Sequence, residues 1–253
     1  MASEAKRGRF IKSNFRLPIV DEKAPQDKDF DAALTAMRNT DADTACIFNC
    51  QMGKGRTTTG MIVAVLLKDI LFGDTSKTYY KNDKVTKEEF PDEDEYLEER
   101  AKRGQYQVLD NISKYIPGVD EGKAHIDHII DLCGVPPAGK NPLIFTTSEK
   151  NKFFTISEKK PHFFVISGTG LQNLRECIVW TQTKHDFEPK KKRPFWKQMS
   201  KNFIERYCYL IVFTVYVKAF HARDFDKSFT HWMDERAELR EVIYNGVQKF
   251  NWI

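Results

Sequence analysis

The chain has 253 residues, enough for one large domain or two small ones around a buried core. Apolar residues make up 41% of it and charged residues 30%, a balance typical of soluble globular proteins rather than disordered chains. The formal net charge of +4 suits an anionic substrate, but it is far too small for a dedicated nucleic-acid-binding protein.

The N-terminal part is predicted to run from an extended segment into a helix, a strand, a loop and a buried helix. Residues 11–31 contain two prolines and are expected to be extended, and a helix is predicted from Asp29 to Met37. The apolar run at 44–49 predicts a buried strand, and the apolar segment at 61–72 predicts a helix that starts near Thr57. The residues between them form a glycine-rich loop that joins a strand to a helix.

The rest of the chain is predicted to be mostly helical. Residues 74–103 are polar and favour a solvated loop or an exposed helix. Apolar residues recur at helical spacing in the segments 105–116, 121–133, 171–177, 201–221 and 226–250. Residues 135–170 show no clear period, so we interpret them as an irregular insertion that divides residues 1–134 from a helical part of the same domain at 171–253. The basic run at 190–194 is interpreted as a solvated loop between helices, with a nuclear-import signal as the alternative.

The loop Cys50–Thr57 has the spacing Cys-x5-Arg-Thr, which predicts a phosphate-binding site. Its glycines allow backbone N–H groups to turn inward and form an anion-binding nest, which the start of the helix closes. The planar fork of Arg56 can bind two phosphate oxygens at once. A Gly-x4-Gly-Lys-Ser/Thr nucleotide loop is not matched, because Lys54 is followed by another glycine. The predicted substrate-binding residues are Gln51, Met52, Gly53, Lys54, Gly55 and Arg56.

Cys50, the first residue of the loop, is expected to be a catalytic nucleophile. It would lie beneath the phosphorus at the positive end of a helix, which stabilises a thiolate. The predicted reaction forms a phosphocysteine that water hydrolyses, while Arg56 and the nest stabilise charge on the phosphoryl oxygens. Thr57 is expected to donate a hydrogen bond to the Cys50 sulfur and help it leave. We expect neither a metal nor another cofactor.

A phosphatase of this kind also needs a carboxylic acid to protonate the leaving oxygen. Asp21 is the best candidate, in the segment between Pro18 and Pro25. In its own sequence context Asp21 could also be a simple turn residue, and Glu22 is an alternative acid.

Several stretches of the chain resemble the paladin family of cysteine-dependent phosphatase-like proteins. They are Phe15–Pro25, Asp29–Asp31, Phe48–Thr59, Gln172–Glu176 and Phe203–Ile211. The resemblance covers most of the chain apart from the first ten residues and 135–170. The chain is more distantly similar to bacterial tyrosine-phosphatase-like phytases, which use the same cysteine mechanism on inositol phosphates.

This resemblance implies an α/β fold, namely the C-terminal portion of a Cys-x5-Arg phosphatase-like fold with a mostly helical C-terminal half. Only 49 residues precede Cys50, so the N-terminal part of that fold is expected to be missing. Asp21 and Pro25 match the Asp-x3-Pro of the phytase-like pattern, which implies that Asp21 is the general acid. The implied substrate is a phosphoinositide, an inositol phosphate or a phosphoprotein. Asn49 stands where active phosphatases of this type usually carry His, so the alternative is a pseudophosphatase that binds phosphorylated ligands as a regulatory module.

Other features favour a cytoplasmic protein. The five cysteines are widely spaced, which points to a reducing compartment rather than to a disulfide scaffold or a zinc site. The N-terminus has no secretory signal, and the apolar stretch 207–217 is about half a membrane span. His125-x-x-His128 is interpreted as surface positions on a helix, not as metal ligands. Peripheral membrane contact is the further partner considered, nucleic acid is not expected, and the oligomeric state is left open.

Overall fold

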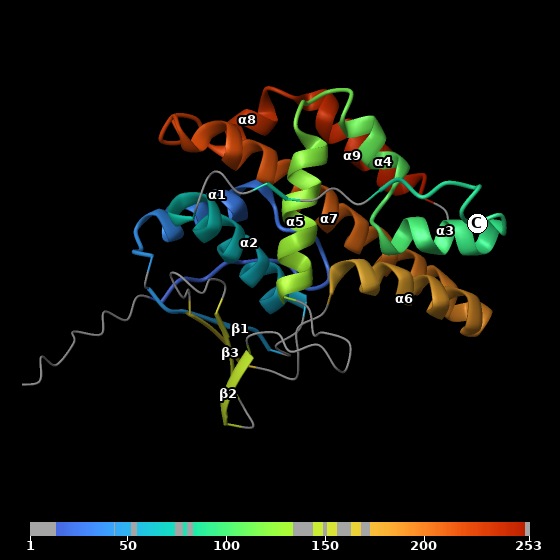
Figure 1. The fold of residues 1–253 in the computed structure, drawn as a ribbon, viewed down its shortest axis with the longest axis horizontal. Helices are drawn as coiled ribbons and strands as arrows, with labels where there is room; N and C mark the ends of the chain where they lie inside the picture. Colours follow the sequence, from blue (N-terminus) through green and yellow to red (C-terminus); the bar gives the residue numbers. More distant parts are fainter. Residues whose placement is uncertain are drawn as a thin grey trace, which may run out of the picture.

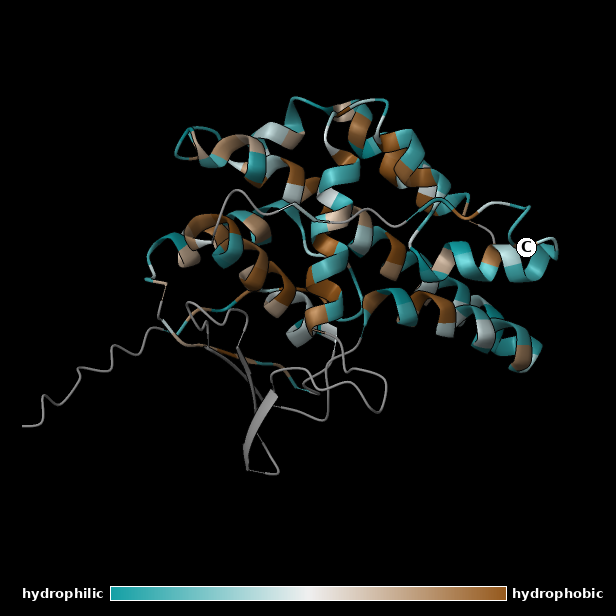
Figure 2. Cartoon of the chain, in the orientation of Figure 1, coloured by the Kyte–Doolittle hydropathy of each residue, from teal (hydrophilic) through white to brown (hydrophobic). Residues whose placement is uncertain are grey.

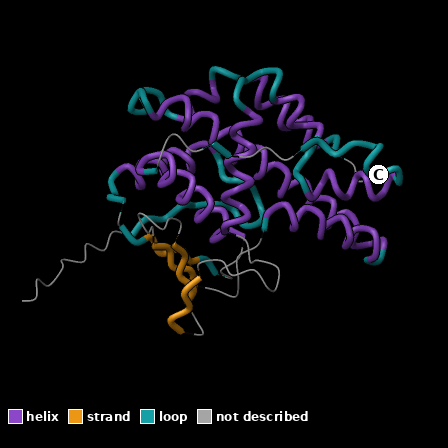
Figure 3. Tube along the Cα trace, in the orientation of Figure 1, coloured by secondary structure: helices purple, strands orange, loops and turns teal. Residues whose placement is uncertain are grey.

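The computed structural model describes residues 14–42, 44–51, 55–73, 78–79, 83–133, 144–148, 151–155, 163–167 and 173–250. Helices make up most of these residues, and a small sheet lies at one edge of the helical body (Figures 1 and 3). The helices are α1 (Asp27–Arg38), α2 (Gly55–Phe72), α3 (Glu93–Lys102), α4 (Gln107–Ile112), α5 (Val119–Cys133), α6 (Leu174–Phe187), α7 (Arg193–His221), α8 (Phe229–Asp234) and α9 (Ala237–Gln248), with a 3-10 turn η1 (Lys190–Lys192). The strands are β1 (Cys46–Asn49), β2 (Ile144–Ser148), β3 (Asn151–Thr155) and β4 (Phe163–Ser167).

The sheet has the order β1-β4-β3-β2, in which β4 runs parallel to β1 and antiparallel to β3. The prediction of a strand before the loop is confirmed by β1, but the prediction that this strand is buried is wrong, since its residues alternate between half-buried and exposed and Ile47 is 72% exposed. The prediction that 135–170 is irregular is wrong for β2, β3 and β4, while the other residues of that segment lie outside the described ones. Each of these strands is five residues long, and a short apolar run such as Phe163–Ser167 lacks the alternation by which strands are usually recognised.

The predicted helices are confirmed with shifted ends. The largest shifts are in α6, which ends at Phe187 rather than near 177, and in α7, which begins at Arg193 rather than near 201, while the segment 226–250 forms two helices, α8 and α9. The basic run at 190–194 therefore forms η1 and the first residues of α7 instead of an irregular loop. Pro194 explains the earlier start, because its fixed φ angle and missing N–H are well tolerated in the first turn of a helix.

The core forms around α2 and α7. α2 is hydrophobic along most of its length (Figure 2), and it is buried from Thr57 to Lys68. α7 packs against α2, α5, α6 and α9. An aromatic cluster closes one end of this core, with Phe30 from α1 lying 4.6 Å from Phe213 and 5.4 Å from Phe229, measured between ring centroids. Burial of each such ring contributes roughly 1.5–3 kcal/mol to folding, so the cluster fixes α1 against α7 and α8.

The turn before β1 is held by a buried lysine. Lys68 is fully buried on α2, and its ammonium donates to the backbone carbonyl oxygens of Ala42 and Thr44 at 3.0 and 2.5 Å, with that of Asp41 at 3.4 Å. A buried ammonium is costly unless its donors are paired, and here the carbonyl groups of the turn supply the partners. The interaction ties the start of β1 to the C-terminal half of α2 and so fixes both ends of the strand–loop–helix unit.

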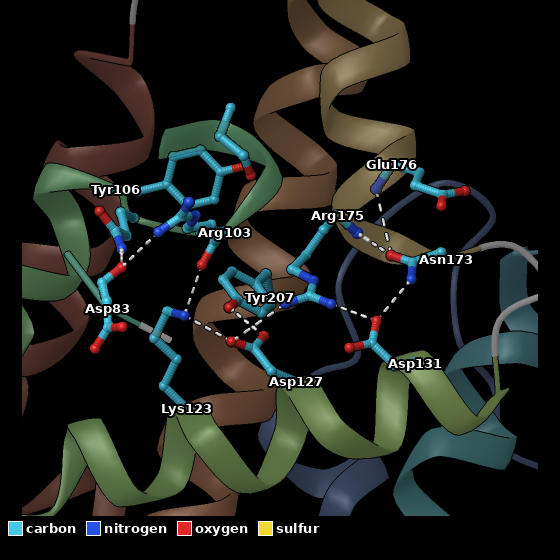
Figure 4. A network of polar contacts seen from close by, with 12 residues as sticks. Asp83, Arg103, Tyr106, Lys123, Asp127, Asp131, Asn173, Arg175, Glu176 and Tyr207 are labelled. Atoms are coloured by element: carbon cyan, nitrogen blue, oxygen red, sulfur yellow. Dashed lines mark hydrogen bonds and ion pairs between the residues drawn. The ribbon is translucent and has the colours of Figure 1, made fainter. Parts of the chain in front are cut away.

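A buried polar network joins α5, α6 and α7 (Figure 4). Asp127 on α5 accepts hydrogen bonds from Lys123 at 2.6 Å and from the Tyr207 hydroxyl at 2.5 Å, and it lies 3.5 Å from Arg175. Arg175 also pairs with Asp131. Because the carboxylate of Asp127 has partners on both sides, it can be buried at little cost. The network fixes the rotation of α7 about its axis and thereby places the neighbouring residue, Arg206.

Candidate functional site

The candidate site lies at the N-terminus of α2, where β1 ends. Cys50 follows the last residue of β1 and is half-buried, Gln51 is exposed, and Gly55 is the first residue of α2. Met52, Gly53 and Lys54 lie outside the described residues. No acidic residue lies in the first turn of α2, so nothing there offsets the partial positive charge at the start of an 18-residue helix. A helix end of this kind favours an anion.

The turn that carries Asp21 reaches the phosphate loop. A carboxylate oxygen of Asp21 accepts a hydrogen bond from Arg56 Nη2 at 3.1 Å. The turn is closed by a hydrogen bond from the Lys23 backbone N–H to the Val20 carbonyl oxygen at 3.2 Å, and Glu22 adopts a left-handed φ of 63° within it. Such a backbone conformation is unfavourable for a non-glycine residue and is often found at functional sites. The sequence-predicted acid and the sequence-predicted phosphate ligand are thus in direct contact.

Polar atoms without hydrogen-bond partners lie beside this ion pair. Within the described part of the chain, Arg56 Nε and the Thr57 hydroxyl are buried and make no hydrogen bond. The predicted hydrogen bond from Thr57 to the Cys50 sulfur is therefore not formed in this structure. An unpaired buried donor costs about 1–3 kcal/mol, so it calls for an explanation. A bound oxyanion and a cysteine thiolate are the acceptors that these two groups would suit.

Arg206 on α7 lies beneath both loops and was not among the predicted site residues. It is 3% exposed, its Nη2 donates to the Lys23 carbonyl oxygen at 2.9 Å, and its Nη1 would lie 3.6 Å from a Cβ atom placed on Gly55. Its guanidinium lies 5.5 Å from the centre of the Phe203 ring. Arg206 therefore supports the Asp21 turn from below while it touches the start of α2.

The charge of Arg206 is incompletely balanced. Burial lowers the pKa of its guanidinium to about 10, against smaller opposing effects of Cys177, Asp21 and Glu22. Its Nε has no hydrogen-bond partner, and no carboxylate lies within ion-pair distance of it among the residues that the structure describes. A buried cation of this kind adds positive potential to an anion site. The sequence pattern indicates that Arg206 is buried. It shares one face of a helix with Phe203, Tyr207 and Leu210, so the arginine occupies a core position.

The far side of the α2 N-terminus is packed. The cavity there measures about 10 Å³, close to the least space that a single water molecule needs, and it is lined by Thr58, Thr59, Cys177 and Arg206 among others.

The prediction that His125 lies on the surface is wrong. His125 is 2% exposed and its Nε2 lies 2.9 Å from a carboxylate oxygen of Asp69, while the ring of Tyr79 stacks on it at 3.9 Å between centroids. Burial lowers the pKa of His125, and the hydrogen bond to Asp69 opposes this shift. Within the described ranges no cluster of His, Cys, Asp or Glu has the arrangement of a metal site.

Comparison with known proteins gives matches of two kinds. Residues 6–68 match a family model named PTPlike_phytase and described as inositol hexakisphosphate. Over 90% of its length the chain is also similar to paladin, with 28% identity over 234 residues to the Gallus gallus protein and 28% over 241 residues to the Homo sapiens protein. The similarity to paladin, with a more distant one to phytases, confirms the resemblance inferred from the sequence. The N-terminal part of the chain, which holds Asp21 and the Cys50–Thr57 loop, is thus the part that is similar to the phytase family model.

The match to paladin covers part of the relatives only. The chain spans 22% of the Gallus gallus protein and 23% of the Homo sapiens protein. No solved structure matches the chain. In the parts of the chain that the structure describes, no helix has the length and apolar character needed to cross a bilayer.

Proposed function

We propose that the chain binds phosphate esters at the Cys50–Thr57 loop and hydrolyses them through a phosphocysteine intermediate. The observation that carries this proposal is the environment of Arg56. One end of its guanidinium contacts the Asp21 carboxylate, and its buried Nε has no hydrogen-bond partner within the described residues. A phosphate oxygen is an acceptor that the planar fork of an arginine can bind in this way.

In the proposed reaction Cys50 attacks the phosphorus and Asp21 protonates the leaving oxygen. Arg56 and the start of α2 stabilise the charge on the other phosphoryl oxygens. Water then hydrolyses the phosphocysteine, and Thr57 donates a hydrogen bond to the departing thiolate. The contact between Asp21 and Arg56 supports these assignments, because the acid and the phosphate ligand must lie on the same side of the substrate.

The proposed substrates are phosphoinositides, inositol phosphates or phosphoproteins. The family model that matches residues 6–68 is described by inositol hexakisphosphate, which supports a polyanionic phosphate ester. Lys54 would add a positive charge to the loop. The proposed compartment is the cytoplasm, where a cysteine nucleophile stays reduced.

A second candidate function is phosphate binding without turnover. Asn49, which precedes the nucleophile, is exposed at the end of β1 and is not the His that active phosphatases of this type usually carry there. A thiolate at Cys50 would then depend on the α2 N-terminus, Arg56 and Arg206, without the help of a neighbouring His. In that case the chain would act as a pseudophosphatase that recognises phosphorylated ligands.

The test is phosphate release from a panel of inositol phosphates, phosphoinositides and phosphopeptides. Turnover by the wild type that is lost in Cys50→Ser supports the enzyme, and Cys46→Ser is the matched control. Cys46 lies on β1 four positions earlier, and burial raises the pKa of its thiol, so it is not expected to react. Binding without turnover supports the pseudophosphatase. This binding is expected to be weaker in Arg56→Lys, because a lysine cannot bind phosphate in a bidentate way. Absence of both binding and turnover would refute the proposed site.

A further inference from the structure

The connection between α6 and α7 exposes large aromatic side chains at an edge of the molecule (lower right in Figure 1). Trp180 is 47% exposed, Phe187 86% and Phe195 51%. Trp196 joins two of them, since its ring lies 5.1 Å from that of Trp180 and 4.9 Å from that of Phe195, measured between centroids. Single exposed apolar residues are common on protein surfaces, but a group of rings in contact, here Trp180, Trp196 and Phe195, marks an interaction site, and Phe187 lies between them in the sequence. We call Trp180, Phe187, Phe195 and Trp196 the aromatic tip.

Basic residues surround the aromatic tip. Residues 184–197 carry six basic and two acidic side chains, a net charge of +4 that equals the formal net charge of the whole chain. The basic residues are Lys184, Lys190, Lys191, Lys192, Arg193 and Lys197. The remaining residues taken together have a formal net charge of zero, and the tip is one of the strongly basic parts of the chain.

The two acidic residues offset only part of this charge. Glu188 accepts a hydrogen bond from Lys192 at 3.0 Å and lies 3.5 Å from Lys184. Lys190 and Lys191 are exposed, and neither forms an ion pair within the described residues. The start of α7, a 29-residue helix, adds the positive end of its dipole at the same place.

We propose that the aromatic tip and its lysines bind the surface of an anionic lipid bilayer. Tryptophan and phenylalanine rings insert into the interfacial region of a membrane, and neighbouring lysines are attracted to anionic headgroups. Charge complementarity favours this partner over a neutral surface, and the exposed rings favour it over a purely electrostatic partner such as nucleic acid. A lysine and an aromatic ring lie side by side in one case, since the Lys184 ammonium is 5.9 Å from the centre of the Trp180 ring.

Membrane binding goes beyond the proposed function because it uses none of the residues of the phosphate site. Phe195 and Arg206 lie eleven residues apart on α7, which corresponds to about 16 Å along a helix. The two regions are thus distinct, although one helix carries both. Cys50→Ser is expected to bind membranes as the wild type does, so the two proposals can fail separately.

The test is co-sedimentation of the full chain with vesicles of phosphatidylcholine alone and of phosphatidylcholine mixed with phosphatidylserine. Binding is expected only to the mixed vesicles and is expected to fall at high salt. Replacing Lys190 and Lys191 by Gln is expected to weaken binding roughly 25-fold, at about fivefold for each lysine near an anionic surface. Phe187→Ser is expected to weaken it roughly tenfold through the loss of a partly inserted ring.

The matched controls are exposed residues of α9 and its C-terminal end, outside the tip. Tyr244 is 61% exposed and Lys249 is exposed, so Tyr244→Ser and Lys249→Gln are expected to bind as the wild type does. Phe195→Ser repeats the test at a second ring. Equal losses in Phe187→Ser and Tyr244→Ser would overturn the proposal. Equal binding to both kinds of vesicle would also overturn it. The same holds if heparin is bound as tightly as the vesicles and Phe187→Ser does not weaken the binding of heparin.

Discussion

Removing the ion pair between Asp21 and Arg56 is expected to change phosphate binding and catalysis in opposite directions. In Asp21→Asn the guanidinium loses a competing carboxylate, and the site loses a negative charge that repels phosphate. The side chain of Arg56 is 27% exposed and that of Asp21 60%, so the ion pair itself is screened and worth only about 0.2–1 kcal/mol. Relief of the repulsion adds a similar amount at a high effective dielectric constant.

Phosphate affinity in Asp21→Asn is therefore expected to rise by about 0.4–2 kcal/mol, or roughly 2- to 30-fold. If Asp21 is the general acid, turnover is expected to fall about 10²- to 10⁴-fold at the same time. Calorimetric titration with inorganic phosphate measures the first effect, and release of phosphate from an inositol phosphate measures the second. A pseudophosphatase would show the gain in affinity alone.

Glu22→Gln is the matched control, since Glu22 lies in the same turn and has no hydrogen bond to Arg56. It is expected to change phosphate affinity less than twofold or threefold, because only a more distant charge is removed. Unchanged or weaker phosphate binding in Asp21→Asn would refute the view that this carboxylate competes for the phosphate ligand. Loss of turnover in Glu22→Gln but not in Asp21→Asn would transfer the role of acid to Glu22.

The remaining predictions concern buried polar groups. Arg206→Met is expected to weaken phosphate binding by about 1 kcal/mol, roughly fivefold. It is expected to change the free energy of unfolding by less than about 1 kcal/mol, because a buried cation without a carboxylate partner stabilises the fold little. Parallel phosphate titration and urea unfolding check this, and a large loss of stability with unchanged affinity would contradict it. Lys68→Met removes the ammonium donor that the carbonyl oxygens of Ala42 and Thr44 share and is expected to lower the free energy of unfolding by about 2–3 kcal/mol, against no change in the exposed control Lys28→Met. Burial lowers the pKa of His125, so the unfolded chain binds more protons at this residue than the folded chain does. The contribution of His125 to the free energy of unfolding is therefore fully present above the ordinary pKa of His and is lost as the pH falls below it. Urea unfolding between pH 7 and pH 5 is expected to show a smaller loss in His125→Gln than in the wild type; an identical pH dependence would exclude His125 as the cause.

Local pattern predicted much of the fold. The apolar runs and glycine spacing that predicted a strand, a loop and a buried helix at 44–72 correspond to β1 and α2. These elements are determined by residues close together in the sequence, which is why their pattern is informative. The strands at 144–167 depend on pairing with one another and with β1, about 120 residues earlier in the case of β4. Short strands of this kind take their conformation from tertiary pairing, so their sequence alone did not predict them.

The residues of the candidate site likewise include some that the sequence predicts and some that only the tertiary structure brings to the site. Cys50, Arg56 and Thr57 are recognisable from their spacing, whereas the contact of Asp21 with Arg56 depends on a turn that folds back over the loop. Arg206 lies 150 residues beyond Arg56, and its place beneath the loops depends on how α7 packs against α2 and on the Asp127–Tyr207 hydrogen bond. The sequence does not predict the burial of His125 for a related reason, because its partner Asp69 is on another helix. Sequence spacing predicts ligands within one loop, but it does not predict charges that tertiary packing brings to that loop.

The position of Arg206 also bears on whether this chain is an enzyme or a binding module. Its cation and the α2 N-terminus favour any anion at the loop, whether a bound phosphate or a Cys50 thiolate, and so they serve both functions equally. Asp21 differs, since a carboxylate that contacts Arg56 opposes phosphate binding, whereas it would assist catalysis as the acid that protonates a leaving group. A site selected only to bind phosphate would gain affinity by losing Asp21. The presence of a carboxylate at this position, in a turn strained at Glu22 and held by Arg206, therefore favours catalysis over binding alone.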